Sequence, residues 1–217
     1  MYISDIAWCP NHPISPRILI LGESHYDKKV KQGEINKHVT SSVVKYLLEG
    51  NVMDKWKEFF YNIAASFGYS KNIKDIREFY GKVYFANYVE ESCDTGDVND
   101  AHQFIKDNRD EYNQAVFEFC NEKNISIICA FSKKAYRALP KIDKSHGEQV
   151  SNISITHYYT VGKTYYKKGV NYDRRIKLNN DLLLYGFNHA SRSGYKNAYE
   201  FLSKEFNKHD ILKHQSS

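Results

Sequence analysis

The sequence predicts an α/β fold, a three-layer α/β/α sandwich around a central, mostly parallel four-stranded sheet. Short apolar runs rich in β-branched residues alternate along the chain with longer segments of helical periodicity. Continuous apolar runs are typical of strands buried on both faces, as in a parallel sheet. Right-handed connections then bring the carboxyl ends of all these strands to one edge. The runs are residues 18–21, 83–89, 125–131 and 182–187.

A fifth run, residues 153–159, alternates between apolar and polar side chains. This pattern predicts an edge strand, or part of a hairpin with residues 160–180.

Helical segments separate the strands. Apolar residues from Trp56 to Phe67 recur at i, i+3, i+4 and i+7, with Asp54 as the predicted N-cap and Gly68 as the predicted stop. Further helices are predicted over residues 43–48, after a Thr40 or Ser41 cap and before Gly50, over residues 112–120, and from Tyr195 onward.

Length and composition bound the class of protein. The 217 residues, 41% of them hydrophobic, fit one domain over residues 1–217 without repeats or linkers. A mean hydropathy of −0.64 and the absence of a long apolar stretch argue against a membrane protein. The N-terminal residues have neither a basic nor an apolar signal region, so no secretory signal is visible, and we expect a cytoplasmic protein. We also expect a monomer.

Cysteine usage and charge narrow the possible ligands. Cys9, Cys93, Cys120 and Cys129 form no CxxC pair, so we expect neither zinc nor an iron–sulfur cluster, and we expect buried free thiols at Cys120 and Cys129. We expect no other metal and no cofactor. The net charge of +5 and the 18 tyrosines permit nucleic-acid binding, in which cations meet phosphates and rings stack on bases. A lysine-rich solvated surface and tyrosines packed in the core are the alternative interpretation.

The loop after the first strand is Gly22-Glu23-Ser24-His25-Tyr26. Glycine permits close approach of the backbone to a ligand, and Glu23 and His25 are ionisable. Because ligands of open α/β sheets bind at the carboxyl ends of the strands, this loop is a candidate site. A polar turn that faces water is the alternative.

The loop after the last strand carries His189, Ser191 and Arg192. His189 can present an imidazole to a ligand, while a hydroxyl, a cation and free backbone N–H groups at the next helix start can hold a phosphate. A simple helix cap at Ser191 or Ser193 is the alternative, and both interpretations can hold together.

Two further strand ends carry polar residues. Asn87 ends an apolar strand, and its amide offers a donor and an acceptor side by side, which suits the edge of a pyrimidine. Hydrogen bonding to the local backbone is the alternative for Asn87. Ser132 is a natural N-cap after the third strand. Lys133 follows it, where its charge could meet the phosphates of a bound strand. Lysines that simply face solvent on the first turn of a helix are the alternative.

These segments together resemble the uracil-DNA glycosylase superfamily, and within it a divergent branch. Members of that superfamily carry Gly-x-Asp/Asn/Ala-Pro-Tyr/Gly after the first strand, an Asn at the end of a later strand, and His-Pro-Ser after the last strand. This chain has loop 22–26, Asn87 and His189-Ala190-Ser191 in that order, within about residues 17–208. The resemblance implies an enzyme that hydrolyses the N-glycosidic bond of uracil, or of a related damaged base, flipped out of DNA.

The resemblance also implies roles for individual residues. Asn87 would bind the uracil edge, His189 would stabilise negative charge on a uracil carbonyl oxygen, and Tyr26 would crowd the C5 position. Glu23 would act on the sugar or on the attacking water. Ser24 and His25 would line the base site, and the DNA backbone would be met by Ser191, Arg192, Ser132 and Lys133.

The chain departs from the pattern of the superfamily at Ser24, where many members carry the Asp or Asn that positions water. His25 and Ala190 stand where the family has proline. Loss of a preorganised charged group at this position can raise the activation barrier for hydrolysis by a few kcal/mol. A non-catalytic relative that binds nucleic acid or a flipped base, in a regulatory or phage-conflict role, is therefore the second hypothesis. An enzyme acting on free nucleotides or nucleosides is the third hypothesis.

Overall fold

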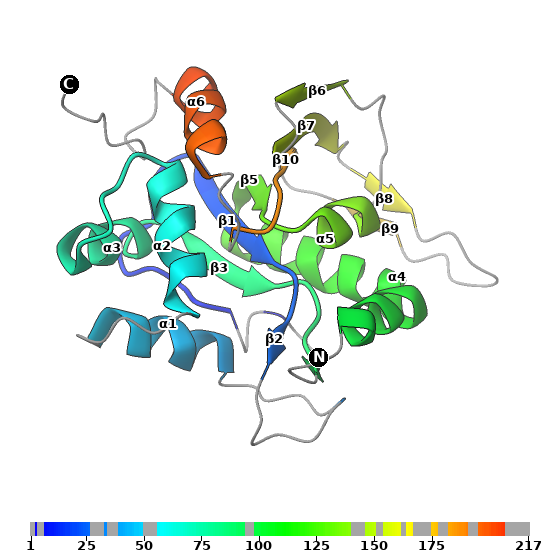
Figure 1. Ribbon diagram of the computed structural model, residues 1–217. Helices are drawn as coiled ribbons and strands as arrows, with labels where there is room; N and C mark the ends of the chain where they lie inside the picture. Colours follow the sequence, from blue (N-terminus) through cyan, green and yellow to red (C-terminus); the bar gives the residue numbers. More distant parts are fainter. Residues whose placement is uncertain are drawn as a thin grey trace.

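Four parallel strands form the centre of the protein, as the sequence predicts (Figure 1). They lie in the order β3-β1-β5-β10, and each neighbouring pair is parallel. The strands are β1 (Arg17–Gly22), β3 (Tyr84–Asn87), β5 (Ile125–Ala130) and β10 (Leu182–Gly186). The computed structural model describes residues 3, 7–26, 33, 39–49, 56–93, 98–139, 146–150, 154–161, 164–166, 175–177, 182–190 and 195–206.

Two antiparallel strands extend this sheet beyond β10. The fifth predicted run forms β7 (Ser154–Val161), which pairs with β10 on one side and with β6 (His146–Val150) on the other. It is therefore not an edge strand, and its hairpin partner precedes it in the chain. Two small sheets pair β2 (His25–Tyr26) with β4 (Ser92–Cys93), and β8 (Thr164–Tyr166) with β9 (Arg175–Lys177).

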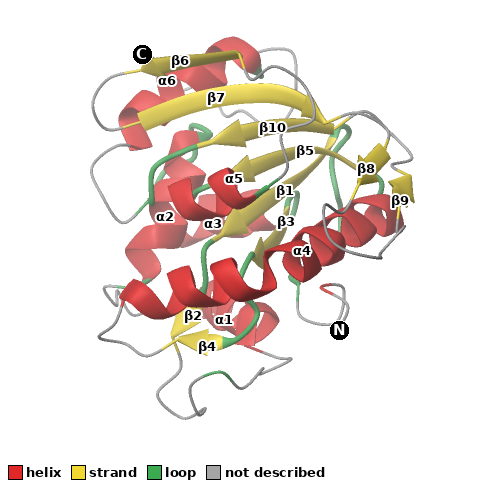
Figure 2. Cartoon of the chain, turned by 90° about the vertical axis from the view of Figure 1, so that its right-hand side faces the viewer, coloured by secondary structure: helices red, strands yellow, loops and turns green. Residues whose placement is uncertain are grey.

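Helices cover both faces of the sheet, which gives the three-layer α/β/α arrangement (Figure 2). Ile18 and Ile20 of β1 point toward α1 (Val39–Glu49), α2 (Lys57–Ser66), α3 (Ile73–Tyr80) and α6 (Tyr195–Glu205). Leu19 and Leu21 point to the other face, toward α4 (Val98–Lys123) and α5 (Lys133–Ala138). Both faces of β1 are thus buried, which explains its continuous apolar sequence. No helix in the described part of the chain is long and apolar enough to cross a membrane.

Local chemistry accounts for several helix ends. Gly68 has a φ of +85°, its N–H bonds Ala65 O, and the N–H of Tyr69 bonds Ala64 O, which is a Schellman ending of α2. The predicted stop at Gly68 is confirmed, as are a helix starting at Tyr195 and the Ser132 cap of α5. Asp54 and Gly50 lie outside the described residues.

Helix α3 was not predicted, because only eight residues carry its pattern. Its cap is Asn72, whose side chain accepts a hydrogen bond of 2.8 Å from the Asp75 N–H. Helix α4 is kinked at Asn108, where φ is −119° and ψ is 17°.

Candidate functional site

The register of the sheet brings the predicted site loops to one edge. Gly22 lies opposite Asn87, and Leu21 and Gly186 both lie opposite Ala130. The four parallel strands therefore end level with one another. Glu23, Asn87, Ser132 and His189 all lie at this carboxyl edge, immediately at or after the ends of β1, β3, β5 and β10.

Asn87 is buried against the glycine that opens the first loop. Its side chain is 7% exposed, and Nδ2 donates a hydrogen bond of 3.3 Å to Thr40 Oγ1 in α1. On the other side of the amide, a Cβ on Gly22 would lie only 2.4 Å from Oδ1. The amide is therefore held between the start of α1 and the backbone of the first loop.

His189 is exposed and packs on an aromatic ring of α2. The imidazole and the Phe59 ring are 4.7 Å apart between centroids, at an angle of 32°. One turn later in α2, Asn62 Nδ2 donates a hydrogen bond of 2.7 Å to the Ala190 carbonyl oxygen. Two side chains of α2 thus hold the loop that carries His189, while the Asn62 Oδ1 atom is buried without a hydrogen-bond partner.

Phe59 also links His189 to β3. Its ring centroid lies 6.5 Å from that of Phe85, and the tip of Phe85 would lie 3.4 Å from a Cβ on Gly22. Asn87 is two residues beyond Phe85 and therefore points to the same face of the sheet. Phe59, Phe85 and Asn87 therefore lie on the α1 and α2 side of the sheet, where Phe59 contacts His189.

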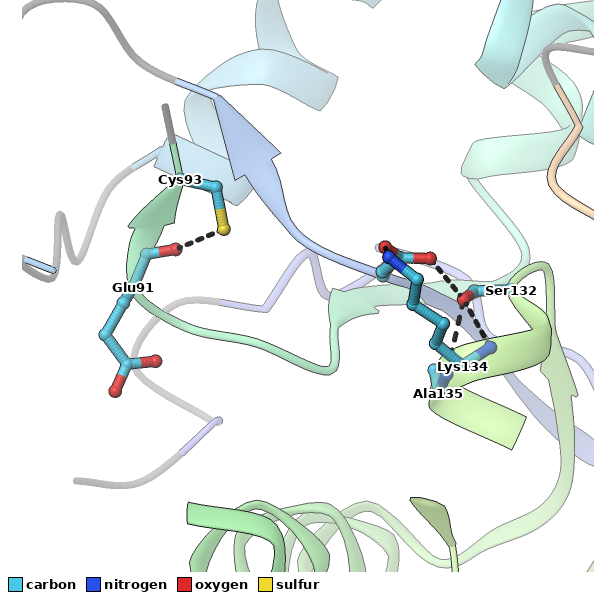
Figure 3. A network of polar contacts seen from close by, with 6 residues as sticks. Glu91, Cys93, Ser132, Lys134 and Ala135 are labelled. Carbon is cyan, nitrogen blue, oxygen red and sulfur yellow. Dashed lines mark hydrogen bonds and ion pairs between the residues drawn. The ribbon is translucent and has the colours of Figure 1, made fainter. Parts of the chain in front are cut away.

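Glu23 makes its contacts on the opposite face, at the start of α5. Ser132 Oγ donates a hydrogen bond of 2.7 Å to Glu23 Oε2, and Lys134 Nζ lies 3.2 Å from Glu23 Oε1. Ser132 is fully buried, and its hydroxyl also accepts from the N–H groups of Lys134 and Ala135 (Figure 3). Both carboxylate oxygens of Glu23 therefore already have partners within the fold.

The rest of the first loop is partly described. Ser24 Oγ is buried without a hydrogen-bond partner, so its donor and acceptor capacity is unused. His25 is half-buried in β2 and lies opposite Ser92 of β4. The backbone of Tyr26 belongs to β2, but its side chain lies outside what the structure describes, as do Ser191 and Arg192.

Sequence reasoning missed several contacts of this edge. Lys134, rather than the exposed Lys133, is the lysine that meets Glu23. Thr40 was predicted only as one of two possible helix caps, with Ser41, and both predictions are wrong because α1 already begins at Val39. Phe59 was predicted only as part of a core face. A signal did exist for Phe59, because it lies on the rim of its apolar stripe, where a side chain can contact both the core and a neighbouring loop.

Burial raises the pKa values of two groups that lie under the carboxyl edge of the sheet, Tyr136 and Cys129. It raises the pKa of Tyr136, whose ring covers Gly186, to about 12, and it raises the pKa of the fully buried Cys129 thiol. Within the described ranges, no cluster of three or more His, Cys, Asp or Glu side chains could hold a metal ion. The side chains described at this edge offer amides, imidazoles, hydroxyls, the Glu23 carboxylate and the Lys134 ammonium group.

Comparison of the chain with protein-family models, with curated proteins and with solved structures gave no match. The geometry of the sheet edge is therefore the basis for any functional conclusion.

Proposed function

We propose that this protein is a uracil-DNA glycosylase-like hydrolase that binds a base flipped out of DNA at the carboxyl edge of β1, β3 and β10. The observation that carries the proposal is the Asn87 amide, held beside Gly22 at the same sheet edge as the exposed imidazole of His189. Excision of a base requires a group that recognises the base, here the amide, and a group that stabilises negative charge on it, here the imidazole.

Asn87 recognises the base in this mechanism. An amide has two N–H donors and two acceptor lone pairs, and Thr40 uses one donor. One donor and the oxygen remain for the Watson–Crick edge of a flipped pyrimidine. Fixing the amide between α1 and the loop lowers the conformational entropy lost on binding.

His189 acts on the departing base. Breaking the N-glycosidic bond leaves negative charge on the base, and an N–H aimed at the carbonyl oxygen stabilises it. Packing on Phe59 fixes the plane of the imidazole before the base arrives.

Glu23 is the carboxylate that directly follows the end of β1, and it could stabilise the positive charge on the sugar or position the attacking water. A carboxylate has about four acceptor positions, so contacts with Ser132 and Lys134 leave capacity for a water molecule. The nearby ammonium group opposes the stabilisation of a cationic sugar.

That arrangement favours a second candidate function, a non-catalytic protein that binds a flipped base. Glu23 is engaged by Ser132 and Lys134, and Ser24 stands where a catalytic carboxylate is expected. Such a protein would keep Asn87 and His189 for binding and would lack hydrolysis.

The deciding experiment incubates the protein with oligonucleotides that carry uracil, hypoxanthine, xanthine or hydroxymethyluracil, followed by alkaline cleavage of abasic sites. Under the proposal, at least one base is excised, and His189→Ala and Glu23→Gln each lower the rate by about 10²-fold. The exposed His102→Ala and Glu122→Gln, both on α4, are the matched controls. Binding to the modified strand without excision supports the second candidate. Excision by Glu23→Gln at the wild-type rate would make Glu23 structural.

We also propose a cytoplasmic location, because Cys93, Cys120 and Cys129 are buried and form no disulfide, which suits a reducing compartment.

A further inference from the structure

Two large aromatic side chains are exposed on the helices that border the candidate site. Tyr46 of α1 is 53% exposed, and Trp56, at the start of α2, is 40% exposed. In the described part of the chain they are the two exposed large apolar residues. Their rings are stacked, with centroids 6.1 Å apart and an angle of 28° between planes. We call Tyr46 and Trp56 the aromatic pair.

A buried cation and a core ring hold the pair in place. Lys57 Nζ lies 5.1 Å from the Tyr46 ring centroid and 5.5 Å from that of Trp56, and the lysine is fully buried. Cation–π contacts are strongest where the cation is removed from water, as Lys57 is here. Trp56 also packs edge-on against the buried Phe60 at 6.0 Å. The rings are therefore ordered before any ligand arrives.

The same two helices connect the aromatic pair to the candidate site. Thr40, which bonds Asn87, lies in α1 six residues before Tyr46, about 9 Å along the helix axis. Phe59, which packs on His189, follows Trp56 by about one turn of α2. Phe60 continues the ring contacts inward to Phe85 of β3 at 5.1 Å. The aromatic pair therefore lies on the two helices whose residues contact Asn87 and His189.

We propose that the aromatic pair stacks on unpaired bases of single-stranded DNA that flank the target base. This inference rests on the proposed function and names its strand preference. Stacking on an aromatic ring needs a free base face, which an unpaired base offers and a base inside a duplex does not. The net charge of +5 complements a polyanionic strand. A preformed pair of exposed rings is the arrangement that sequence-tolerant binders of single strands use.

The test uses intrinsic tryptophan fluorescence. The chain has two tryptophans, and Trp8 is half-buried, with its indole N–H bonded to Tyr80 O. In a Trp8→Phe background, Trp56 is the single reporter, and a lesion-free single-stranded oligonucleotide should quench it saturably. The same sequence as a duplex should quench much less. Loss of one stacking ring costs about 1–3 kcal/mol, so Tyr46→Ala should weaken binding by about 5–150-fold while Tyr46→Phe retains it.

Fluorescence anisotropy of the labelled strand extends the test to Trp56→Ala and Trp56→Phe, with unfolding temperatures to verify folding. Unchanged single-strand affinity in both alanine variants overturns the inference. Equal affinity for single strand and duplex also overturns it. A change in sedimentation with unchanged DNA binding assigns the aromatic pair to self-association and overturns it as well.

Parallel excision assays separate this inference from the proposed function. His189→Ala should lose excision and keep the Trp56 quenching. If the protein excises nothing but binds single strands through the aromatic pair, the proposed catalysis fails and this inference stands. If excision occurs and the alanine variants bind normally, this inference fails alone.

Discussion

The Asn87 amide oxygen occupies the space into which a side chain on Gly22 would extend, since a Cβ there would lie 2.4 Å from it. The two residues are paired across β1 and β3, so their approach is fixed by the register of the sheet. Gly22 is not among the residues with positive φ, so contact with Asn87, and not backbone conformation, requires a glycine here. Gly22 and Asn87 therefore form a single packing unit, in which a side chain cannot be added at Gly22 without displacing the Asn87 amide.

The first prediction tests this unit with a double-mutant cycle. Gly22→Ala should lower the free energy of unfolding by about 1–3 kcal/mol, because the added methyl overpacks the site. Asn87→Ala removes the obstructing amide, so the double variant should recover much of that loss. Urea unfolding measures the coupling, which we expect at about 1 kcal/mol or more. Additive effects would mean that Asn87 moves aside freely, and its amide would then not be preorganised.

The sheet could be predicted because its information is local. Four continuous apolar runs mark four strands buried on both faces, and the chain order then fixes which ends meet. Strand β6 carries no such run, since His146–Val150 is mostly polar, so β6 was not predicted, whereas the alternating run 153–159 did predict β7.

The contacts of the site depend on tertiary geometry that no local pattern encodes. Ser132 was predicted as a cap, yet the choice between Lys133 and Lys134 as the partner of Glu23 depends on about 100° of rotation per residue in α5. Likewise, nothing in the sequence near Thr40 indicates that its hydroxyl meets an amide 47 residues away.

The second prediction concerns Ser132, whose hydroxyl caps α5 and donates to Glu23. Ser132→Ala should lower the free energy of unfolding by about 2 kcal/mol, since it removes a cap and leaves Glu23 with one partner fewer. Lys134→Ala should cost less than about 1 kcal/mol, because its ion pair is partly exposed. The exposed Lys133→Ala is the neighbouring control, with a change within about 0.5 kcal/mol. A larger loss in Lys133→Ala than in Lys134→Ala would contradict the contact of Lys134 with Glu23.

The third prediction concerns thiol reactivity. Cys9 is exposed, whereas Cys93, Cys120 and Cys129 are buried. A chromogenic disulfide reagent should therefore label one thiol quickly in the native protein and all four in denaturant. Desolvation raises the pKa of Cys9, so its labelling should still accelerate at about pH 9. Cys9→Ser should remove the fast phase, and a fast phase that persists would mean that a second thiol is accessible.

The last prediction concerns alkaline pH and Tyr112 of α4. The Tyr112 hydroxyl donates a hydrogen bond to the Glu91 carboxylate, and the side chain is 5% exposed. Burial first, and then the hydrogen bond with Glu91, raise the pKa of Tyr112 above its ordinary value of 10.0. The folded state therefore keeps this proton at a pH where the unfolded chain releases it.

The sign of the effect follows from that difference. The contribution of Tyr112 to stability is fully present below about pH 10 and is lost as pH rises from there toward the folded pKa. Each such group contributes a slope of up to about 1.4 kcal/mol per pH unit. Tyr112→Phe should therefore be less stable than wild type at pH 8, yet lose less stability between pH 10 and 11. Urea unfolding across that range measures both slopes, and the exposed Tyr46→Phe is the control that should follow wild type. Parallel slopes for wild type and Tyr112→Phe would mean that Tyr112 ionises as easily in the folded protein as in the unfolded chain.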